Sequence, residues 1–220
     1  MLLSESEENY LKTIFNLSYP SNQAVATNAI AKKLNTAAAS VTDMLKKLSD
    51  KNLVIYEKYK GVTLSNDGNK MAKRLVRKHR IWEVFLVEKL NFSWDEVHDV
   101  AEQLEHINSP QLVQKLDKFL GYPTTDPHGD PIPDEAGNIQ DIQSIKLTEL
   151  KQGDKATVVG VDDTSSSFLQ YLDELKIQLG LTFEVIQKIE FDHSFVLKSK
   201  NHSFSISKQV ADNILVKVKN

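Results

Sequence analysis

Six side chains with metal-binding nitrogen or oxygen atoms lie close together in the middle of the chain: His79, Glu83, His98, Glu102, Glu105 and His106. His79 and Glu83 are four residues apart, so on a helix they share one face. The other four follow one another at spacings that also place them on a common helix face. Carboxylates and imidazoles on a half-buried helix face are costly unless they are paired or bound to a metal. A set of oxygen and nitrogen ligands without thiolate suits divalent manganese, iron, cobalt or zinc.

Composition limits the alternatives. A chain of 220 residues has room for one large domain or two to three small ones. It contains no cysteine, so disulfides and thiolate-bound zinc or iron–sulfur sites are excluded. The polar, acidic start MLLSESEENY does not resemble a signal peptide, and no apolar run is long enough to span a bilayer. We therefore expect a cytoplasmic protein with no membrane association.

The charge is unevenly distributed along the chain. Residues 1–80 contain 14 Lys and Arg against 7 Asp and Glu, whereas the remaining residues contain 13 against 23. A basic N-terminal third favours a polyanionic partner, and nucleic acid is the first candidate. The alternative is a solvated basic face with no partner.

The N-terminal third shows the pattern of a winged helix-turn-helix. Residues 5–17 predict an amphipathic helix that is capped by Ser4, with Glu7 at the capping-box position. Two shorter helices, at 26–34 and 39–49, are separated by the turn Asn35–Thr36 and match a helix-turn-helix. Residues 53–64 then predict a hairpin with a basic, aromatic tip, which would be the wing. The alternative is a small helical domain with an ordinary surface hairpin.

The remainder of the chain changes from helical to strand patterns. Helices are predicted near 67–90, 94–107 and 111–120, and their surplus apolar surface indicates a helical dimer interface. Residues 121–141 are rich in Pro, Gly and Asp and predict an irregular or flexible linker. From residue 146, five short strands and one helix over 166–175 indicate a small SH3-like β-barrel.

Several motifs at matching spacing carry a resemblance to a known family: ENYLKTIF, SVTDMLKKLSDKNLVIYEKYKGVTLSNDG, RKHRIWEVFL, VHDVAEQLEHI and HGDPIPD. Over essentially its whole length, the chain resembles the diphtheria-toxin-repressor family of metal-dependent transcriptional regulators. This family includes iron-dependent repressors and manganese transport regulators. The resemblance implies a multidomain α+β protein with three domains. They are a winged helix-turn-helix DNA-binding domain (1–72), a helical dimerisation and metal-binding domain with a Pro-rich linker (73–140), and an SH3-like, FeoA-like domain (146–220).

The resemblance also implies two sets of metal ligands. An ancillary site would use His79, Glu83, His98 and a ligand from the barrel, for which we align Asp162 in preference to Asp163. A primary site would use Glu102, Glu105, His106 and Asn9. Asn9 stands where iron-type members have Met and manganese-type members have Asp, and Glu8 is a nearby substitute. Glu102 stands where iron-type members have Cys. Lys12 stands where some two-metal regulators place a carboxylate, so we expect no binuclear cluster.

The function that follows is a homodimeric repressor that controls metal-ion homeostasis by binding a double-stranded DNA operator. Mn(II) is the expected metal because the ligands are hard oxygens, Fe(II) is the alternative, and Zn(II), Co(II) or Ni(II) would bind in vitro. The expected DNA contacts are Ala39, Ser40, Thr42, Asp43, Lys46, Lys47, Lys58, Tyr59 and Lys60. Metal would join the first helix to the dimerisation helices, and without it the clustered carboxylates would repel one another.

We expect no catalytic residues and no small organic substrate. Two other classes stay open on the residues alone. One is a metallohydrolase that uses the same ligands around an open coordination position. The other is a metal-independent winged-helix regulator whose barrel binds a peptide or small effector. His128, His193 and His202 lack companion ligands in the sequence and are interpreted as structural or surface residues.

Overall fold

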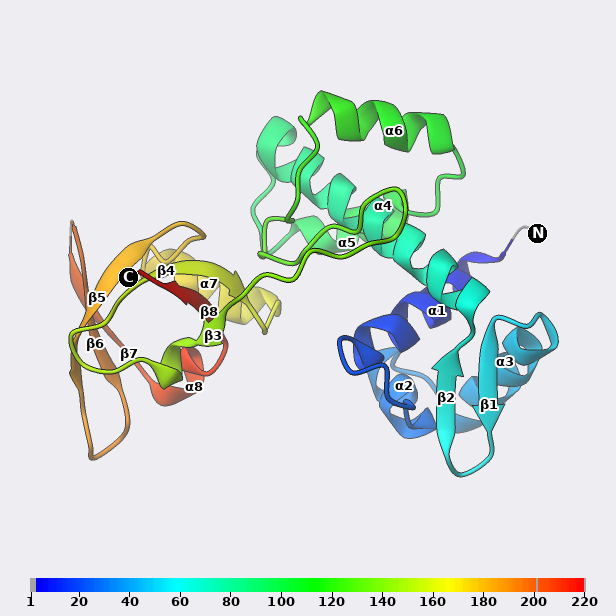
Figure 1. The fold of residues 1–220 in the computed structure, drawn as a ribbon, viewed down its shortest axis with the longest axis horizontal. Helices are drawn as coiled ribbons and strands as arrows, with labels where there is room; N and C mark the ends of the chain where they lie inside the picture. Colours follow the sequence, from blue (N-terminus) through cyan, green and yellow to red (C-terminus); the bar gives the residue numbers. More distant parts are fainter. Residues whose placement is uncertain (1–2, 201, 220) are drawn as a thin grey trace. The chain divides into compact units, whose positions relative to one another are not determined.

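The computed structural model describes residues 3–200 and 202–219 (Figure 1). Its contacts divide the chain into two compact units. The first contains the chain up to His79 with Glu102–Val113 and Pro133–Ile139, and the second contains Arg80–Ala101, Gln114–Ile132 and the chain from Gln140 onward. The boundary after His79 falls inside one continuous helix, α4 (Asn66–Leu90).

The predicted winged helix-turn-helix is confirmed in the first unit. It consists of α1 (Glu5–Ser18), α2 (Thr27–Lys33), α3 (Ala38–Asp50), the antiparallel strands β1 (Val54–Glu57) and β2 (Gly61–Leu64), and the start of α4. The predicted capping box is present, since the Glu7 N–H donates to Ser4 Oγ and the Ser4 N–H donates to the Glu7 carboxylate. Its core is formed by fully buried aliphatic residues from every helix and from the wing, among them Leu11, Ile14, Ile30, Leu45 and Val62.

The helix that carries His98 and Glu102 is shorter than expected. We predicted a helix over 94–107, but α5 spans Val97–Leu104, and α6 spans Pro110–Phe119. Side-chain contacts within the second unit hold the preceding residues in turns: Trp94 Nε1 donates to Asp173, and Gln170 donates to Asp95. No helix among the described residues is both long enough and apolar enough to cross a membrane.

The Pro-rich segment after α6 forms an irregular structure that is held by hydrogen bonds. Asp126 Oδ1 accepts hydrogen bonds from the backbone N–H groups of His128 and Asp130, which closes a tight turn. A β-bridge joins Thr125 to Pro131, and Ile132 is buried. The turn therefore holds its polar side chains in fixed positions.

The C-terminal domain is a six-stranded antiparallel sheet, which confirms the five predicted strands and adds a short one, β3. The strand order is β3-β8-β4-β5-β6-β7, with bounds β3 (Ile145–Lys146), β4 (Lys155–Val161), β5 (Thr182–Lys188), β6 (Phe195–Ser199), β7 (Ser203–Ile206) and β8 (Ile214–Val218). A short 3-10 helix, η1 (Leu147–Glu149), and the helices α7 (Ser166–Glu174) and α8 (Lys208–Ala211) complete the domain. Its core is apolar and includes Phe183, Phe195 and Ile214.

Candidate metal centres

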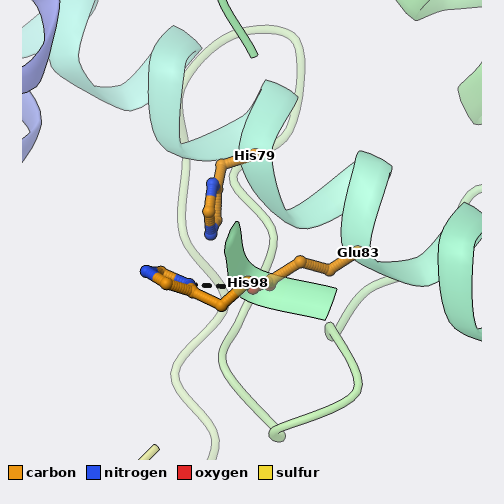
Figure 2. A group of neighbouring side chains, drawn as sticks. All are labelled: His79, Glu83 and His98. Atoms are coloured by element: carbon orange, nitrogen blue, oxygen red, sulfur yellow. Dashed lines mark hydrogen bonds and ion pairs between the residues drawn. The ribbon is translucent and has the colours of Figure 1, made fainter. Parts of the chain in front are cut away.

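His79 and Glu83 lie one turn apart on α4, and both side chains are buried. His98, near the start of α5, places its Nδ1 3.3 Å from Glu83 Oε1. Ligand atoms of the three residues all lie within 4.8 Å of one another. Figure 2 shows the imidazoles of His79 and His98 beside Glu83. Helical spacing on α4 places His79 beside Glu83, and α5 contributes His98, so the three ligands predicted for an ancillary site form one group.

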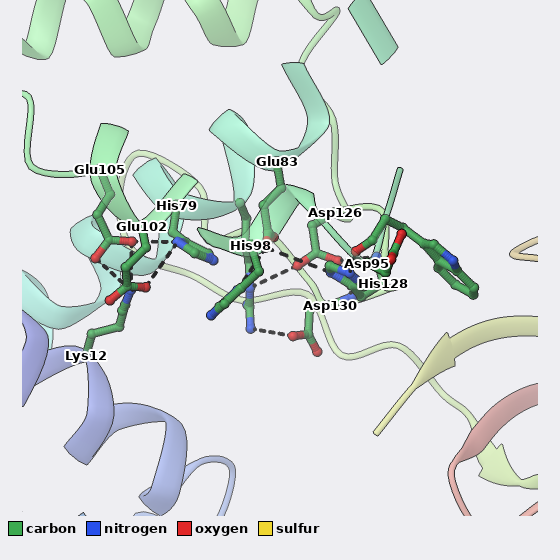
Figure 3. Close-up of polar contacts among 12 residues, drawn as sticks. Lys12, His79, Glu83, Asp95, His98, Glu102, Glu105, Asp126, His128 and Asp130 are labelled. Carbon is green, nitrogen blue, oxygen red and sulfur yellow. Dashed lines mark hydrogen bonds and ion pairs between the residues drawn. The ribbon is translucent and has the colours of Figure 1, made fainter. Parts of the chain in front are cut away.

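A second ligand group lies in the first unit and consists of His79, Glu102 and Glu105. Glu105 is fully buried, and its carboxylate is 2.5 Å from His79 Nδ1. Figure 3 shows Lys12 reaching from α1 to this group, with its Nζ 2.5 Å from Glu102 and 2.7 Å from Glu105. Burial raises the pKa of Glu105, but the hydrogen bond with His79 and the positive charge of Lys12 outweigh it, so the pKa lies below its ordinary value.

The contact with Lys12 corrects one expectation. We predicted that Glu102 and Glu105 would repel one another in the absence of metal. That prediction is wrong for this pair, because an ammonium group lies within hydrogen-bonding distance of both carboxylates. The pair is charge-compensated by the chain itself.

The other two predicted primary ligands, His106 and Asn9, make different contacts. His106 Nδ1 is 2.6 Å from the carboxylate of Glu8, the residue considered above as a substitute for Asn9. His106 belongs to none of the ligand groups that the described residues form. Asn9 Oδ1 is buried and has no hydrogen-bond partner within the described part of the chain. An orphaned buried amide oxygen is costly and fits a cation ligand.

The structure shows a third ligand group, which sequence reasoning missed. Glu83, Asp126 and His128 are all buried in the second unit, and their ligand atoms lie within 4.8 Å of one another (Figure 3). His128 Nε2 is 2.8 Å from the carbonyl oxygen of Trp94. This contact assigns the ring proton to Nε2 and leaves the Nδ1 lone pair, 3.9 Å from Glu83, available for a ligand.

Charge is less well balanced in this third group. Burial raises the pKa of Asp126 well above its ordinary value, and the carboxylates of Glu83 and Asp130 raise it further. Arg80, with its Nε 3.5 Å from Asp126, offsets only part of this effect. Of the two interpretations of His128, structural or surface, the surface one is wrong, because its side chain is buried. The signal was present in the sequence, since an Asp two residues before a His in a tight, Pro-rich turn can direct two ligands to one point.

Asp162, the predicted ligand from the sheet domain, follows β4. Its carboxylate lies 3.3 Å from Lys146 Nζ, its N–H donates to Asn213, and its side chain is exposed. It belongs to none of the ligand groups within residues 3–200 and 202–219. The second choice, Asp163, accepts a hydrogen bond from the Ser165 N–H beside the start of α7.

The predicted DNA contacts on α3 lie on its solvent-facing side. Ala39, Ser40, Asp43, Lys46 and Lys47 are exposed, whereas Val41, Leu45 and Leu48 face the core. Thr42 donates its hydroxyl hydrogen to the Ala38 carbonyl. The small residues at the start of the helix leave its backbone accessible.

The wing presents its three predicted contacts at its tip. Tyr59 is 93% exposed and has a positive φ of 68°. Lys58 Nζ lies 5.0 Å from the centroid of the Tyr59 ring, and Lys60 pairs with Glu57 at 2.6 Å. An exposed aromatic ring with an ammonium group beside it suits contact with a polyanion.

The donor sets fit a divalent metal. The three groups combine carboxylates and imidazoles, most of them buried, and the chain has no cysteine to supply a thiolate. Such ligands suit hard to borderline divalent cations. The outward face of α3 and the tip of the wing are exposed and carry lysines, as predicted for a DNA contact.

Three family descriptions match successive parts of the chain. The N-terminal DNA-binding domain of iron-dependent repressors matches residues 2–62, their metal-binding and dimerisation domain matches 65–134, and the FeoA domain matches 145–218. The iron-dependent repressor IdeR of Mycobacterium tuberculosis is 31% identical over 164 residues, which is 71% of each chain. The regulator MntR of Oceanobacillus iheyensis is 33% identical over 117 residues, covering 53% of this chain and 78% of that relative.

Solved structures agree with these relatives. A manganese-dependent transcriptional repressor in complex with manganese superposes with a TM-score of 0.86 at 32% identity, over 97% of this chain and 100% of the other. The manganese regulator SloR gives a TM-score of 0.75 at 31% identity, over 97% and 98% of the two chains. Winged helix, ligand-bearing helices and FeoA domain together define a metal-dependent, DNA-binding transcriptional repressor. This chain belongs to the iron-dependent repressor family, which includes IdeR, the diphtheria toxin repressor and MntR.

Proposed function

We propose that this protein is a homodimeric, manganese-responsive repressor of genes for metal-ion homeostasis. The observation that carries the choice of metal is the group of Glu102, Glu105 and His79, together with the unpartnered Asn9 oxygen. These are nitrogen and hard oxygen donors, and a glutamate stands at the position where a thiolate would favour softer metals. Fe(II) is the second candidate, because IdeR is among the relatives of similar identity.

The ligands explain how metal can influence DNA binding. Asn9 belongs to α1 of the winged helix, whereas Glu102 and Glu105 lie on or just after α5. A divalent cation that bound both these carboxylates and the Asn9 amide oxygen would connect α1 to the segment that contains α5. His106 and Glu8, already in contact, add a second link between the same two segments.

The buried carboxylate of Glu7 on α1 forms ion pairs that connect α1 to α3. The carboxylate of Glu7 lies 2.5 Å from Lys51 Nζ and 3.1 Å from Lys47 Nζ, at the C-terminal end of α3. Burial raises the pKa of Glu7, but the hydrogen bonds from Lys51, the Ser4 N–H and Lys47 outweigh it and bring the pKa to about 2. A constraint on α1 therefore also orients the proposed recognition helix.

In the proposed complex, α3 enters the major groove of the operator. Ser40, Thr42 and Asp43 face the bases, and an Asp can accept a hydrogen bond from a cytosine amino group. Lys46, Lys47 and the wing residues Lys58, Tyr59 and Lys60 contact phosphates and supply affinity rather than sequence choice. In a homodimer, the two recognition helices would read half-sites about one helical turn apart.

Exposed apolar residues around α6 support the dimer. Leu90, Phe119 and Tyr122 are 52%, 64% and 63% exposed, which is unusual for side chains of this size. A symmetric helical interface would cover them.

Asp162 remains the predicted ligand from the sheet domain.

Operator binding measured with Mn(II), Fe(II) or chelator tests the proposal. The full chain and its own upstream DNA are titrated in parallel, with Glu102→Gln as the site variant and Glu88→Gln, an exposed glutamate on α4, as its control. We expect binding that requires metal, with Mn(II) effective at the lowest free concentration, and that is lost only in Glu102→Gln. Equal binding in chelator would refute the metal switch, and a lower threshold for Fe(II) would identify an iron-responsive repressor.

A further inference from the structure

We propose that Lys12 is a resident cation of the primary metal centre, which competes with the metal ion for Glu102 and Glu105 and thereby sets the metal concentration to which the protein responds. This inference rests on the proposed metal binding at that centre. Lys12 is not itself a ligand, but it would determine how tightly the centre binds the metal ion.

Lys12 is buried for a residue of its type. Its side chain is 9% exposed, and its Nζ lies 2.5 Å from Glu102 and 2.7 Å from Glu105. Lysine is seldom buried unless it is paired. These two contacts supply that pairing, and they join α1 to carboxylates about 90 residues further along the chain.

The two carboxylates use the same oxygens that a metal would need. Glu105 is fully buried, its carboxylate is also in contact with His79, and the Lys12 ammonium lies against the same group. An ammonium group has three donors and no lone pair, so it cannot act as a ligand itself. A metal ion that binds this pair of carboxylates would therefore compete with the Lys12 ammonium for their oxygen lone pairs.

Charge repulsion adds to this competition. Lys12 places a positive charge a few ångströms from the position of an incoming dication, in surroundings with little water to screen it. The ammonium also stabilises the carboxylates before metal arrives, because a buried charge without a partner is unfavourable. Both effects weaken metal binding, and the second also stabilises the metal-free protein.

The variant Lys12→Met tests this directly, because it keeps most of the length of the unbranched side chain and removes its charge. We expect the Kd for Mn(II), measured on the full-length protein by competition with a metal indicator, to fall by about tenfold or more. The metal-free melting temperature should fall at the same time. Lys12→Arg keeps the charge and should bind Mn(II) within about threefold of the unaltered protein. An unchanged or higher Kd in Lys12→Met overturns the proposal, because Lys12 would then support the bound metal.

Lys51→Met is the matched control. It also removes a lysine from a buried glutamate in the same unit, since Lys51 pairs with Glu7, but that glutamate is not a proposed ligand. It should lower the melting temperature and leave the Kd for Mn(II) unchanged. Tighter binding in both variants would overturn the proposal, because the effect would then follow from general destabilisation. If Lys12→Met does not fold, Lys12→Gln takes its place in the same measurements.

The same titrations separate this inference from the proposed function. If the unaltered protein binds Mn(II) and then its operator, while Lys12→Met binds Mn(II) equally well, only the role of Lys12 fails. If the unaltered protein binds no divalent metal, the proposed function fails and the inference fails with it.

Discussion

Two buried carboxylate groups in this molecule are balanced in opposite ways. In the first unit, Lys12 compensates Glu102 and Glu105, and the pKa of Glu105 is lowered. In the second unit, Asp126 lies near the negative charges of Glu83 and Asp130, and its pKa is raised despite Arg80. A metal at the first group must replace a cation, whereas a metal at the second relieves an unfavourable charge. We therefore expect the second group to gain more stability from metal, and the first to need a higher metal concentration for binding.

Loss of Glu105 should have the largest effect. Glu105→Gln removes a ligand and leaves Lys12 with one carboxylate, and breaking a buried ion pair costs about 3–5 kcal/mol. We expect a much lower metal-free melting temperature and no operator binding at Mn(II) concentrations that saturate the unaltered protein. Thermal unfolding and operator titration measure the two effects. A stable variant with normal metal response would show that the first group is not the controlling site.

Glu7 offers a compensated pair without a metal. Its pKa is lowered from 4.5 to about 2, so the folded state binds protons less readily than the unfolded state. The stability it provides is complete above the unfolded-state pKa and is lost as the pH falls from about 4.5 toward 2. The shift corresponds to on the order of 3 kcal/mol.

Urea unfolding across this pH range, with Glu7→Gln as the comparison, measures the contribution. The free energy of unfolding of the unaltered protein should exceed that of Glu7→Gln above about pH 4.5, and the difference should disappear as the pH falls toward 2. A constant difference between the two would show that the pair with Lys51 does not control the titration.

Removing the charge of Asp126 should have a smaller effect, and of opposite sign to the loss of Glu105. An amide oxygen in Asp126→Asn can still accept the hydrogen bonds from His128 and Asp130, while the unfavourable charge disappears. The metal-free protein should be as stable as the unaltered one, or more stable by roughly 1 kcal/mol. The rise in melting temperature on adding Mn(II) should shrink. A clear loss of metal-free stability would contradict the comparison of the two groups.

Asp162→Asn should have the smallest effect. Its carboxylate is exposed and pairs with Lys146, and an exposed ion pair contributes at most about 1 kcal/mol. We expect little change in metal-free stability, as measured by thermal unfolding. A reduction in metal-induced stabilisation as large as that of Asp126→Asn would identify Asp162 as a ligand from the sheet domain.

Local periodicity allowed much of the fold to be predicted. The capping box of α1, the wing and the five strands depend on neighbouring residues, and each was recognisable from the sequence. The start of α5 was not, because contacts of Trp94 and Asp95 with residues beyond position 160 override the local helix signal.

The sequence by itself determined the ligand pair that shares a helix, His79 with Glu83, because helical spacing fixes which side chains share a face. Glu102 and Glu105 were expected on one helix as well, but α5 ends at Leu104, just before Glu105. Only the tertiary structure decided which groups meet across long separations. It brought Lys12 to Glu102 and Glu105, Glu8 to His106, and Asp126 and His128 to Glu83. The physical reason is that the charge balance of a buried group depends on every element packed around it, and residues distant in sequence supply most of those neighbours.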